Sequence, residues 1–210
     1  MSAREEIHEE EFDRAGARLR SPGCQRGCAA GTHVSNVGYG FGGQPLIQGI
    51  WVDSSNQQTG TWDIKTGKGS IIALGADVRI TDRFTVQANM GYETDSVEGD
   101  GAGYKFSRVP LELIGYYSVT ERFRMGLGVR RVQNTNLQGS GDRDGQHYAY
   151  THSGGGVLEG QYFFSTPSTT SREPLFGMYL RYMHENYQLR DYQDEKKDGN
   201  HFALGLMFYY

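Results

Sequence analysis

The residues that could do chemistry in this sequence are few, and a serine nucleophile with a histidine partner is the first arrangement to test. His147, His152, Ser153 and His184 are the candidates. A serine nucleophile needs a histidine base within hydrogen-bond reach and a third group to orient that base. His152 and Ser153 are neighbours, so in a strand their side chains face opposite sides. His184, two residues beyond Tyr182, is expected at an outer rim. We therefore expect no catalytic residues and no enzyme activity.

Metal-ligating residue types occur in three places, each with too few ligands. Cys24 and Cys28 lie near His33, but a closed zinc site takes four ligands and nothing supplies the fourth. The loop 139–145 carries two acidic residues, which are few for calcium. The charged segment 194–198 is interpreted in the same way, as a solvated loop. We expect no metal site and no cofactor.

The composition combines a low mean hydropathy with many aromatic residues. The chain has 210 residues, of which 12% are aromatic, with Tyr outnumbering Phe by 14 to 10, and its mean hydropathy is −0.62. No apolar run is long enough for a transmembrane helix. A strand of a membrane barrel exposes only every second side chain to lipid, which keeps mean hydropathy low. The net charge of −4 gives no reason to expect a nucleic-acid partner.

Apolar residues recur with period two from Leu46 onward, in runs about as long as a barrel strand of roughly 9–11 residues. Large apolar residues occupy one face of each run and smaller or polar residues the other. The first strand is expected around Leu46–Asp53, with its facing left open. The expected lipid-facing sets, at alternate positions, are Ile72 to Ile80, Phe84 to Tyr92, Val109 to Tyr117, Phe123 to Val129, Leu158 to Phe164, Phe176 to Tyr182 and Phe202 to Tyr210.

The connections alternate in length, which supports an even number of strands. Thr81–Arg83 and Thr120–Arg122 make tight turns, and a further short connection precedes Leu175. The other connections are longer and polar: 54–67, 95–103, 135–153 and 191–199. Short turns on one side and long loops on the other are typical of bacterial outer-membrane barrels. The sequence predicts an all-β, eight-stranded antiparallel up-and-down transmembrane β-barrel.

The predicted inward face is charged with both signs. Charges held away from water need partners and hydrogen bonds, and an eight-stranded barrel is just wide enough to be filled by side chains. We therefore expect a paired charge network that closes the lumen. Its predicted members are Asp77, Arg79, Glu93, Arg108, Glu112, Arg124, Arg130, Glu159, Arg181 and Glu185.

Segments 106–117 and 124–130, with Gly91–Tyr92 and an aromatic C-terminus, resemble a family of small bacterial outer-membrane β-barrel proteins of the OmpA/OmpW-like superfamily. The likeness covers Gly38–Tyr210, and segment 106–117 is its most specific part. The resemblance implies insertion by the barrel-assembly machinery, which recognises a terminal aromatic residue with apolar residues at alternate positions. The matching residues are Leu204, Leu206, Phe208 and Tyr210.

We expect two parts along the chain, residues 1–35 and residues 36–210. The first is an atypical N-terminal segment, disordered or with a mis-assigned start, because it has an acidic run where a leader should have an apolar one. The second is the barrel. The expected location is the bacterial outer membrane, with its lipid and lipopolysaccharide as partners and a monomeric state.

The function expected is structural, surface-interacting or of limited permeability, with a plugged charged lumen. Two alternatives stay open. One is a lipid-modifying outer-membrane enzyme, which would need a polar triad facing lipid. The other is a soluble lipocalin-like ligand-binding barrel, which would place its apolar residues inside rather than outside.

Overall fold

The regular structure of the chain consists of β-strands. In a computed structural model of the protein, the described residues are 32–52, 55, 57–99, 102–141, 147–152, 154–165, 174–189 and 196–210. They form thirteen strands. Across these residues no helix has the length and apolar character needed to cross a membrane.

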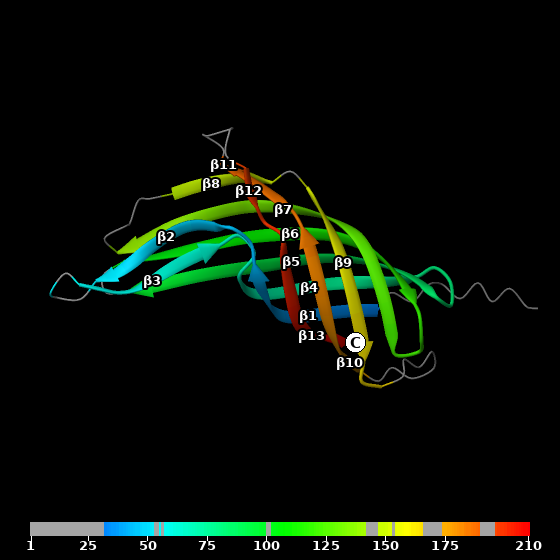
Figure 1. Cartoon of the computed structure of the whole chain (residues 1–210). Coiled ribbons are helices and arrows are strands. Elements are labelled where there is room, and N and C mark those ends of the chain that lie inside the picture. Colours follow the sequence, from blue (N-terminus) through cyan, green and yellow to red (C-terminus); the bar gives the residue numbers. More distant parts are fainter. Residues whose placement is uncertain are drawn as a thin grey trace, which may run out of the picture.

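Eight strands close into a barrel (Figure 1). Each pairs antiparallel with the next, and the first also pairs with the last, so no edge is left open. The predicted eight-stranded antiparallel barrel is confirmed. Its strands are β1 (Thr32–Gly42), β4 (Gly69–Arg79), β5 (Phe84–Gly99), β6 (Ala102–Ser118), β7 (Phe123–Gly141), β9 (Gly155–Phe163), β10 (Leu175–His184) and β13 (His201–Tyr209).

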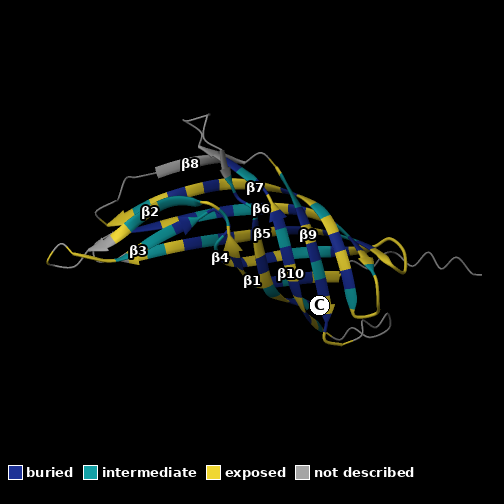
Figure 2. Ribbon diagram, viewed as in Figure 1, coloured by how far each residue is buried: buried dark blue, intermediate teal, exposed yellow. Residues whose placement is uncertain are grey.

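Burial alternates along each barrel strand, as the period-two pattern predicts (Figure 2). Large apolar side chains point out: Leu127 is 71% exposed and Val129 is 64% exposed. Their neighbours Gly126 and Arg130 face the lumen, and Arg130 is buried. Successive side chains of a strand must face opposite sides of the sheet. The barrel therefore has an apolar outer surface and an interior in which buried polar and charged side chains lie among apolar ones such as Ile114 and Met183.

Two turns at one end of the barrel are built in the same way. Thr81 Oγ1 accepts a hydrogen bond from the Phe84 amide at 3.0 Å, and Thr120 Oγ1 accepts one from the Phe123 amide at 3.0 Å. A threonine hydroxyl that bonds the backbone a few residues on stabilises a tight turn. Both turns therefore end in a phenylalanine at the barrel rim, and the final residue, Tyr210, pairs with His33 at this same end.

Strands β5, β6 and β7 continue well beyond the barrel and carry a second small structure, which we call the outer unit. A hairpin made by β2 and β3 lies beside them (Figure 1), and β8, β11 and β12 extend the sheet from β7. The bounds of these strands are Pro45–Val52 for β2, Gln58–Lys65 for β3, His147–His152 for β8, Asn186–Leu189 for β11 and Lys196–Asp198 for β12.

The outer unit has an apolar core of its own. Within it the Trp62 ring stacks on Tyr104 at 5.7 Å between centroids. The buried members of this core are Ile64, Tyr104, Phe106, Leu137 and Tyr187, and Leu46, Ile47, Trp62 and Val97 pack against them.

The predicted first strand is wrong. Leu46–Asp53 falls largely on β2, which pairs only with β3 outside the barrel. The first barrel strand is β1, which begins at Thr32 and so also crosses the predicted domain boundary after residue 35. Two of its inward positions are Gly38 and Gly40, where an added Cβ would meet Tyr179 and Gly67. The outward residues between and beside these glycines are Val37, Tyr39 and Phe41, so the apolar period of β1 was present in the sequence.

All four predicted long loops contain strand residues: segment 54–67 contains β3, and segment 191–199 contains β12. Segment 95–103 continues β5 and β6, and segment 135–153 contains the end of β7 and all of β8. Outward side chains such as Ser96, Asn136 and Gln138 are polar, as in loops, although burial alternates over 135–138.

Candidate functional site: the filled lumen

The predicted lumen charges are buried inside the barrel, with one exception. Arg79 lies exposed at the end of β4, one strand position from the turn, and does not join the network. The buried members are Asp77, Glu93, Arg108, Glu112, Arg124, Arg130, Glu159, Arg181 and Glu185.

At the end of the barrel near the tight turns, Arg124 of β7 is the centre of the packing. Its Nη1 lies 2.9 Å from Asp77 Oδ2, and its Nε donates to Gln161 Oε1 at 2.6 Å. Its guanidinium carbon lies 4.3 Å from the centroid of the Tyr116 ring, and Arg124 also donates to the hydroxyl of Tyr209. Arginine on an aromatic face is attracted by the ring quadrupole. This end is closed by one cation held between aromatic rings.

The middle of the lumen is occupied by Arg181 of β10. It pairs with Glu159 of β9 and, through Nη1, with Glu112 Oε2 of β6 at 2.9 Å. The Tyr116 hydroxyl donates to Glu159 Oε1 at 2.7 Å. Gln161 donates to both Glu159 and Tyr116 and accepts from Arg124. It therefore connects the Arg181–Glu159 pair to Arg124 at the end near the tight turns.

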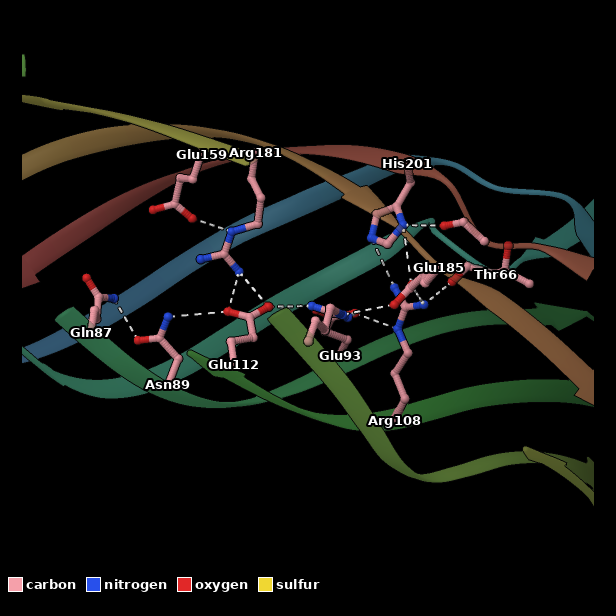
Figure 3. A network of polar contacts seen from close by, with 12 residues as sticks. Thr66, Gln87, Asn89, Glu93, Arg108, Glu112, Glu159, Arg181, Glu185 and His201 are labelled. Carbon is pink, nitrogen blue, oxygen red and sulfur yellow. Dashed lines mark hydrogen bonds and ion pairs between the residues drawn. The ribbon is translucent and has the colours of Figure 1, made fainter. Parts of the chain in front are cut away.

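Nearer the outer unit, two arginines share the same carboxylate partners, and Figure 3 shows Arg108 beside Glu93 and Glu185. Arg130 lies 2.7 Å from Glu93, 2.7 Å from Glu112 and 2.9 Å from Glu185. Arg108 lies 2.5 Å from Glu93 and 2.9 Å from Glu185. Each acid here bridges two cations, so the ion pairs form a connected column from Glu159 to Arg108. Hydrogen bonds of Gln161 join this column to the Arg124–Asp77 pair.

A connected column of this kind has a structural consequence. Breaking a buried ion pair by removing one partner leaves an uncompensated charge and is strongly destabilising. The side chains themselves take up the bore that eight strands enclose. The arrangement can therefore close the barrel and make its interior rigid. Within the described part of the chain, three atoms of its charged groups, Asp77 Oδ1, Glu93 Oε1 and Arg181 Nη2, are buried without a hydrogen-bond partner.

Two outer loops interlock over the mouth of the lumen. The Gln44 amide donates to the carbonyl of Asp198 at 2.9 Å, and the Thr66 amide donates to the carbonyl of Gln44 at 3.0 Å. Thr66 Oγ1 donates to Asp198 O at 3.0 Å. The connection before β4 is thereby tied to the connection before β13.

The connection before β4 packs directly against Arg108, at the end of the charge column nearest the outer unit. Arg108 donates to the carbonyl of Thr66, and a Cβ on Gly67 would come within 2.3 Å of the His201 side chain. Both Thr66 and His201 are buried. Tyr187 of the outer unit also contacts Arg108, and burial raises the pKa of its phenol well above the ordinary value. The mouth is therefore covered by backbone as well as side chains.

The lumen charges also have neutral polar partners, which were not among the predicted site residues. Their signal was available: each occupies an inward position of its strand. They are Gln87, Asn89, Tyr116, Gln161, Tyr209 and His201, all buried. Gln87 donates to Asn89 Oδ1 at 2.6 Å, and Asn89 donates to Glu112 at 3.3 Å.

The structure does not bring the predicted chemical candidates together. His184 is exposed at the end of β10, whereas Ser153 and the side chains of His147 and His152 lie outside what the structure describes. His33 is exposed on β1 and packs against Tyr210 at 5.9 Å between ring centroids. Cys24 and Cys28 lie outside the described residues, as do residues 142–145 and 194–195. Among the residues that are described, no group of three potential metal ligands occurs.

Comparisons with known proteins find likeness in structure and none in sequence. No protein-family model matches the chain, and no curated protein matches it. A structure of Neisserial surface protein A aligns with a TM-score of 0.41 and 12% identity, covering 84% of this chain and 94% of that one. A structure of Ail, the attachment invasion locus protein of Yersinia pestis, gives 0.41 and 9%, covering 86% and 99%. The outer membrane protein AlkL gives 0.45 and 12%, covering 86% and 90%.

Proposed function

We propose that this protein is an integral outer-membrane barrel that serves as a closed structural element and presents its outer unit at the cell surface. The observation that carries the proposal is the column of buried ion pairs from Glu159 to Arg108, which Gln161 joins to the Arg124–Asp77 pair, with two loops tied across its mouth. A barrel that conducts would need a water-filled bore. Here the same space holds paired side chains.

The outer surface supports a membrane location. Its apolar side chains form a belt, and aromatic residues lie at the rim next to the tight turns. These rim residues are Phe84, Phe123, Phe164, Phe176 and Tyr210. An apolar band flanked by an aromatic girdle is the outer surface of bacterial outer-membrane barrels. By the same rule the short turns face the periplasm and the outer unit faces the exterior.

The lumen argues against the soluble alternative. A soluble ligand-binding barrel encloses its ligand in an interior that is open to it and leaves a polar outer surface. This barrel has the reverse arrangement. A lipid-modifying enzyme would need a nucleophile and base that face lipid. Of the predicted nucleophile and base candidates, only the side chain of His184 is described, and it is exposed.

The test is conductance of the full chain in a planar bilayer. We expect no steady, large-conductance openings, whereas a known porin inserted under the same conditions conducts. Insertion is checked separately, by heat-modifiable migration of the reconstituted protein on a gel. Reproducible ion-selective openings from folded protein would contradict the proposal.

We also propose that the last strand is read by the barrel-assembly machinery. Leu204, Leu206 and Tyr210 are exposed at alternate positions of the outer face, and Tyr210 is 64% exposed. Deleting Tyr210 should lower the amount of protein inserted into membranes of an expressing cell. Replacing Tyr210 by Phe, which keeps the terminal ring, should preserve insertion. Unchanged insertion of the deletion variant would contradict this role.

A further inference from the structure

The outer face of β6 and β7 has a groove in its apolar belt. The groove has a volume of about 390 Å³ and is shallow and open. Ala88, Leu113 and Val129 line it on three adjacent strands, directly opposite one another in register. Ala88 is smaller than Val86 and Met90, which flank it on the same face. The groove therefore lies over the short Ala88 side chain. Its size and lining suit a hydrocarbon chain.

A cation stands at the exterior end of this groove. Arg131 lines the groove, is exposed, and lies opposite Leu111 in register. It is eight residues beyond Phe123 of the rim, the same separation that joins Phe84 to Tyr92 on β5. At roughly 3.4 Å per residue and a tilt near 40°, that separation reaches about 20 Å across the membrane. Arg131 is therefore at the level of the exterior head groups.

Beyond Arg131 the same face of β7 is neutral and rich in amides. Gln133, Asn134, Asn136 and Gln138 are all exposed. The whole segment 131–141 contains no acidic residue. Lys105 of β6 lies opposite Gln138 and is exposed. Toward the exterior, the outer face of β6 and β7 thus carries a stripe made of the apolar groove, Arg131, the amide row and Lys105.

We propose that this stripe binds lipopolysaccharide of the exterior leaflet. An acyl chain would lie in the groove, a phosphate of lipid A would pair with Arg131, and the sugars that follow would contact the amide row and Lys105. The amide side chains offer both donors and acceptors, as sugar hydroxyls require. Arginine matches the phosphate through parallel N–H donors.

The length of the polar row favours lipopolysaccharide over a phospholipid. From Arg131 to Gln138 the strand advances roughly 23 Å at about 3.3 Å per residue. A phospholipid head group is compact and would reach Arg131 alone. A glycolipid with several sugars can cover the row to Lys105. The proposal uses the lipid-facing surface of the barrel and does not depend on whether the lumen conducts.

The experiment titrates the full chain, folded in detergent micelles, with purified rough lipopolysaccharide and follows binding by thermophoresis. We expect Arg131→Gln to weaken binding about fivefold, the effect of one cation near an anionic surface. Ala88→Leu should weaken it as well, by filling the groove. The matched control is Arg122→Gln, an exposed arginine in a turn at the opposite end, which should bind like the wild type.

Two further arms identify the source of the phosphate. Dephosphorylated lipopolysaccharide should bind the wild type and Arg131→Gln equally, because the contact that distinguishes them is gone. Phosphatidylglycerol should bind more weakly than lipopolysaccharide and should be insensitive to Lys105→Gln. Folding of each variant is checked by heat-modifiable migration. Unchanged affinity in Arg131→Gln, equal loss in Arg122→Gln, or phosphatidylglycerol binding as tight as lipopolysaccharide would each overturn the proposal.

Discussion

Strands β6 and β7 pass through both the barrel and the outer unit, and the two halves of each strand have opposite patterns. In the barrel their inward side chains include Glu112, Arg124 and Arg130 beside the apolar Ile114, and outward positions are apolar, as at Leu127. In the outer unit the inward side chains include Phe106 and Leu137, and the outward ones are polar. The polarity of the sheet is therefore reversed along a continuous strand.

The reversal occurs between Phe106 and Arg108, which are successive inward residues of β6. The guanidinium carbon of Arg108 lies 5.8 Å from the Phe106 ring centroid and 5.7 Å from that of Tyr187. Arg108 thus belongs to the charge column on one side and to the aromatic core on the other. The comparison teaches that the surroundings of the outer face decide its polarity: lipid selects apolar residues outside, and water selects polar ones.

The largest expected effect is the loss of a lumen cation. Arg130→Ala should lower the free energy of unfolding by about 3–5 kcal/mol, because three buried carboxylates lose their shared partner. Urea unfolding in detergent free of lipopolysaccharide measures it. Arg131→Ala is the matched control, since it removes the same side chain one residue along, on the exposed face. Equal effects of the two variants would contradict the buried column.

A charge on the outer face of β7 should lower the stability of the protein in the barrel half of the strand and hardly change it in the outer-unit half. Leu127→Arg places a cation in the apolar belt and should cost about 2–4 kcal/mol in a bilayer. Gln138→Arg, on the same face of the same strand in the outer unit, should change the stability by less than about 0.5 kcal/mol. Unfolding in lipid vesicles compares the two. If Leu127→Arg is as stable as the wild type, the register of β7 is wrong.

The outer unit should respond to a loss of apolar volume without affecting the barrel. Leu137→Ala should destabilise its core by about 2 kcal/mol, the low end for a leucine truncation, since this small core can partly collapse. Trp62 reports on this core in a Trp51→Phe background, where it is the only remaining tryptophan. Its fluorescence should change at lower urea than in the parent, while heat-modifiable migration of the barrel is retained. Simultaneous loss of both signals would show a single cooperative unit.

The smallest effect concerns Asp95 of β5, whose side chain accepts a hydrogen bond from the Lys65 amide at 3.4 Å. Burial raises the pKa of Asp95, and Lys68 only partly opposes this. Because the folded pKa lies above the unfolded one, the protonated form is favoured by folding, and this stability is lost as pH rises through the folded pKa. Asp95→Asn should therefore stabilise the outer unit at neutral pH by less than about 1 kcal/mol and flatten its dependence on pH. A destabilising effect at pH 7 would contradict it.

The sequence predicts the barrel well because lipid imposes a strict alternation on its strands. From Ile72 to Tyr210 the expected outward residues are outward in the structure, with few intermediate exceptions such as Ala76. The charge column follows from the same alternation, read on the opposite face. Which acid pairs with which arginine depends on the stagger between strands, and no single strand contains that information.

The outer unit was less predictable for a physical reason. Its strands face water on one side, so segments such as 95–103 and 135–153 have the composition of loops. Strand β1 was predictable, because its outward Val37, Tyr39 and Phe41 alternate in the same period of two. Its inward Gly38 reflects close packing, since an added Cβ there would meet the Tyr179 hydroxyl at 2.3 Å. The alternation of side chains predicted Arg79 in the lumen. It is exposed instead, because it is the last residue of β4 and alternation alone does not show where a strand ends.

The seam between β1 and β13 also has a consequence for the timing of folding. It joins Val34 to Tyr209 and Gly42 to His201, residues from the first and the last strand that the structure describes. No shorter segment can complete the ring, so the ribosome must release residue 209 before the barrel can close. Contacts between residues so distant in sequence are slow to form. In the interval the apolar belt has no lipid around it and the lumen charges have no partners, so the unclosed chain is the form most exposed to aggregation and to proteases.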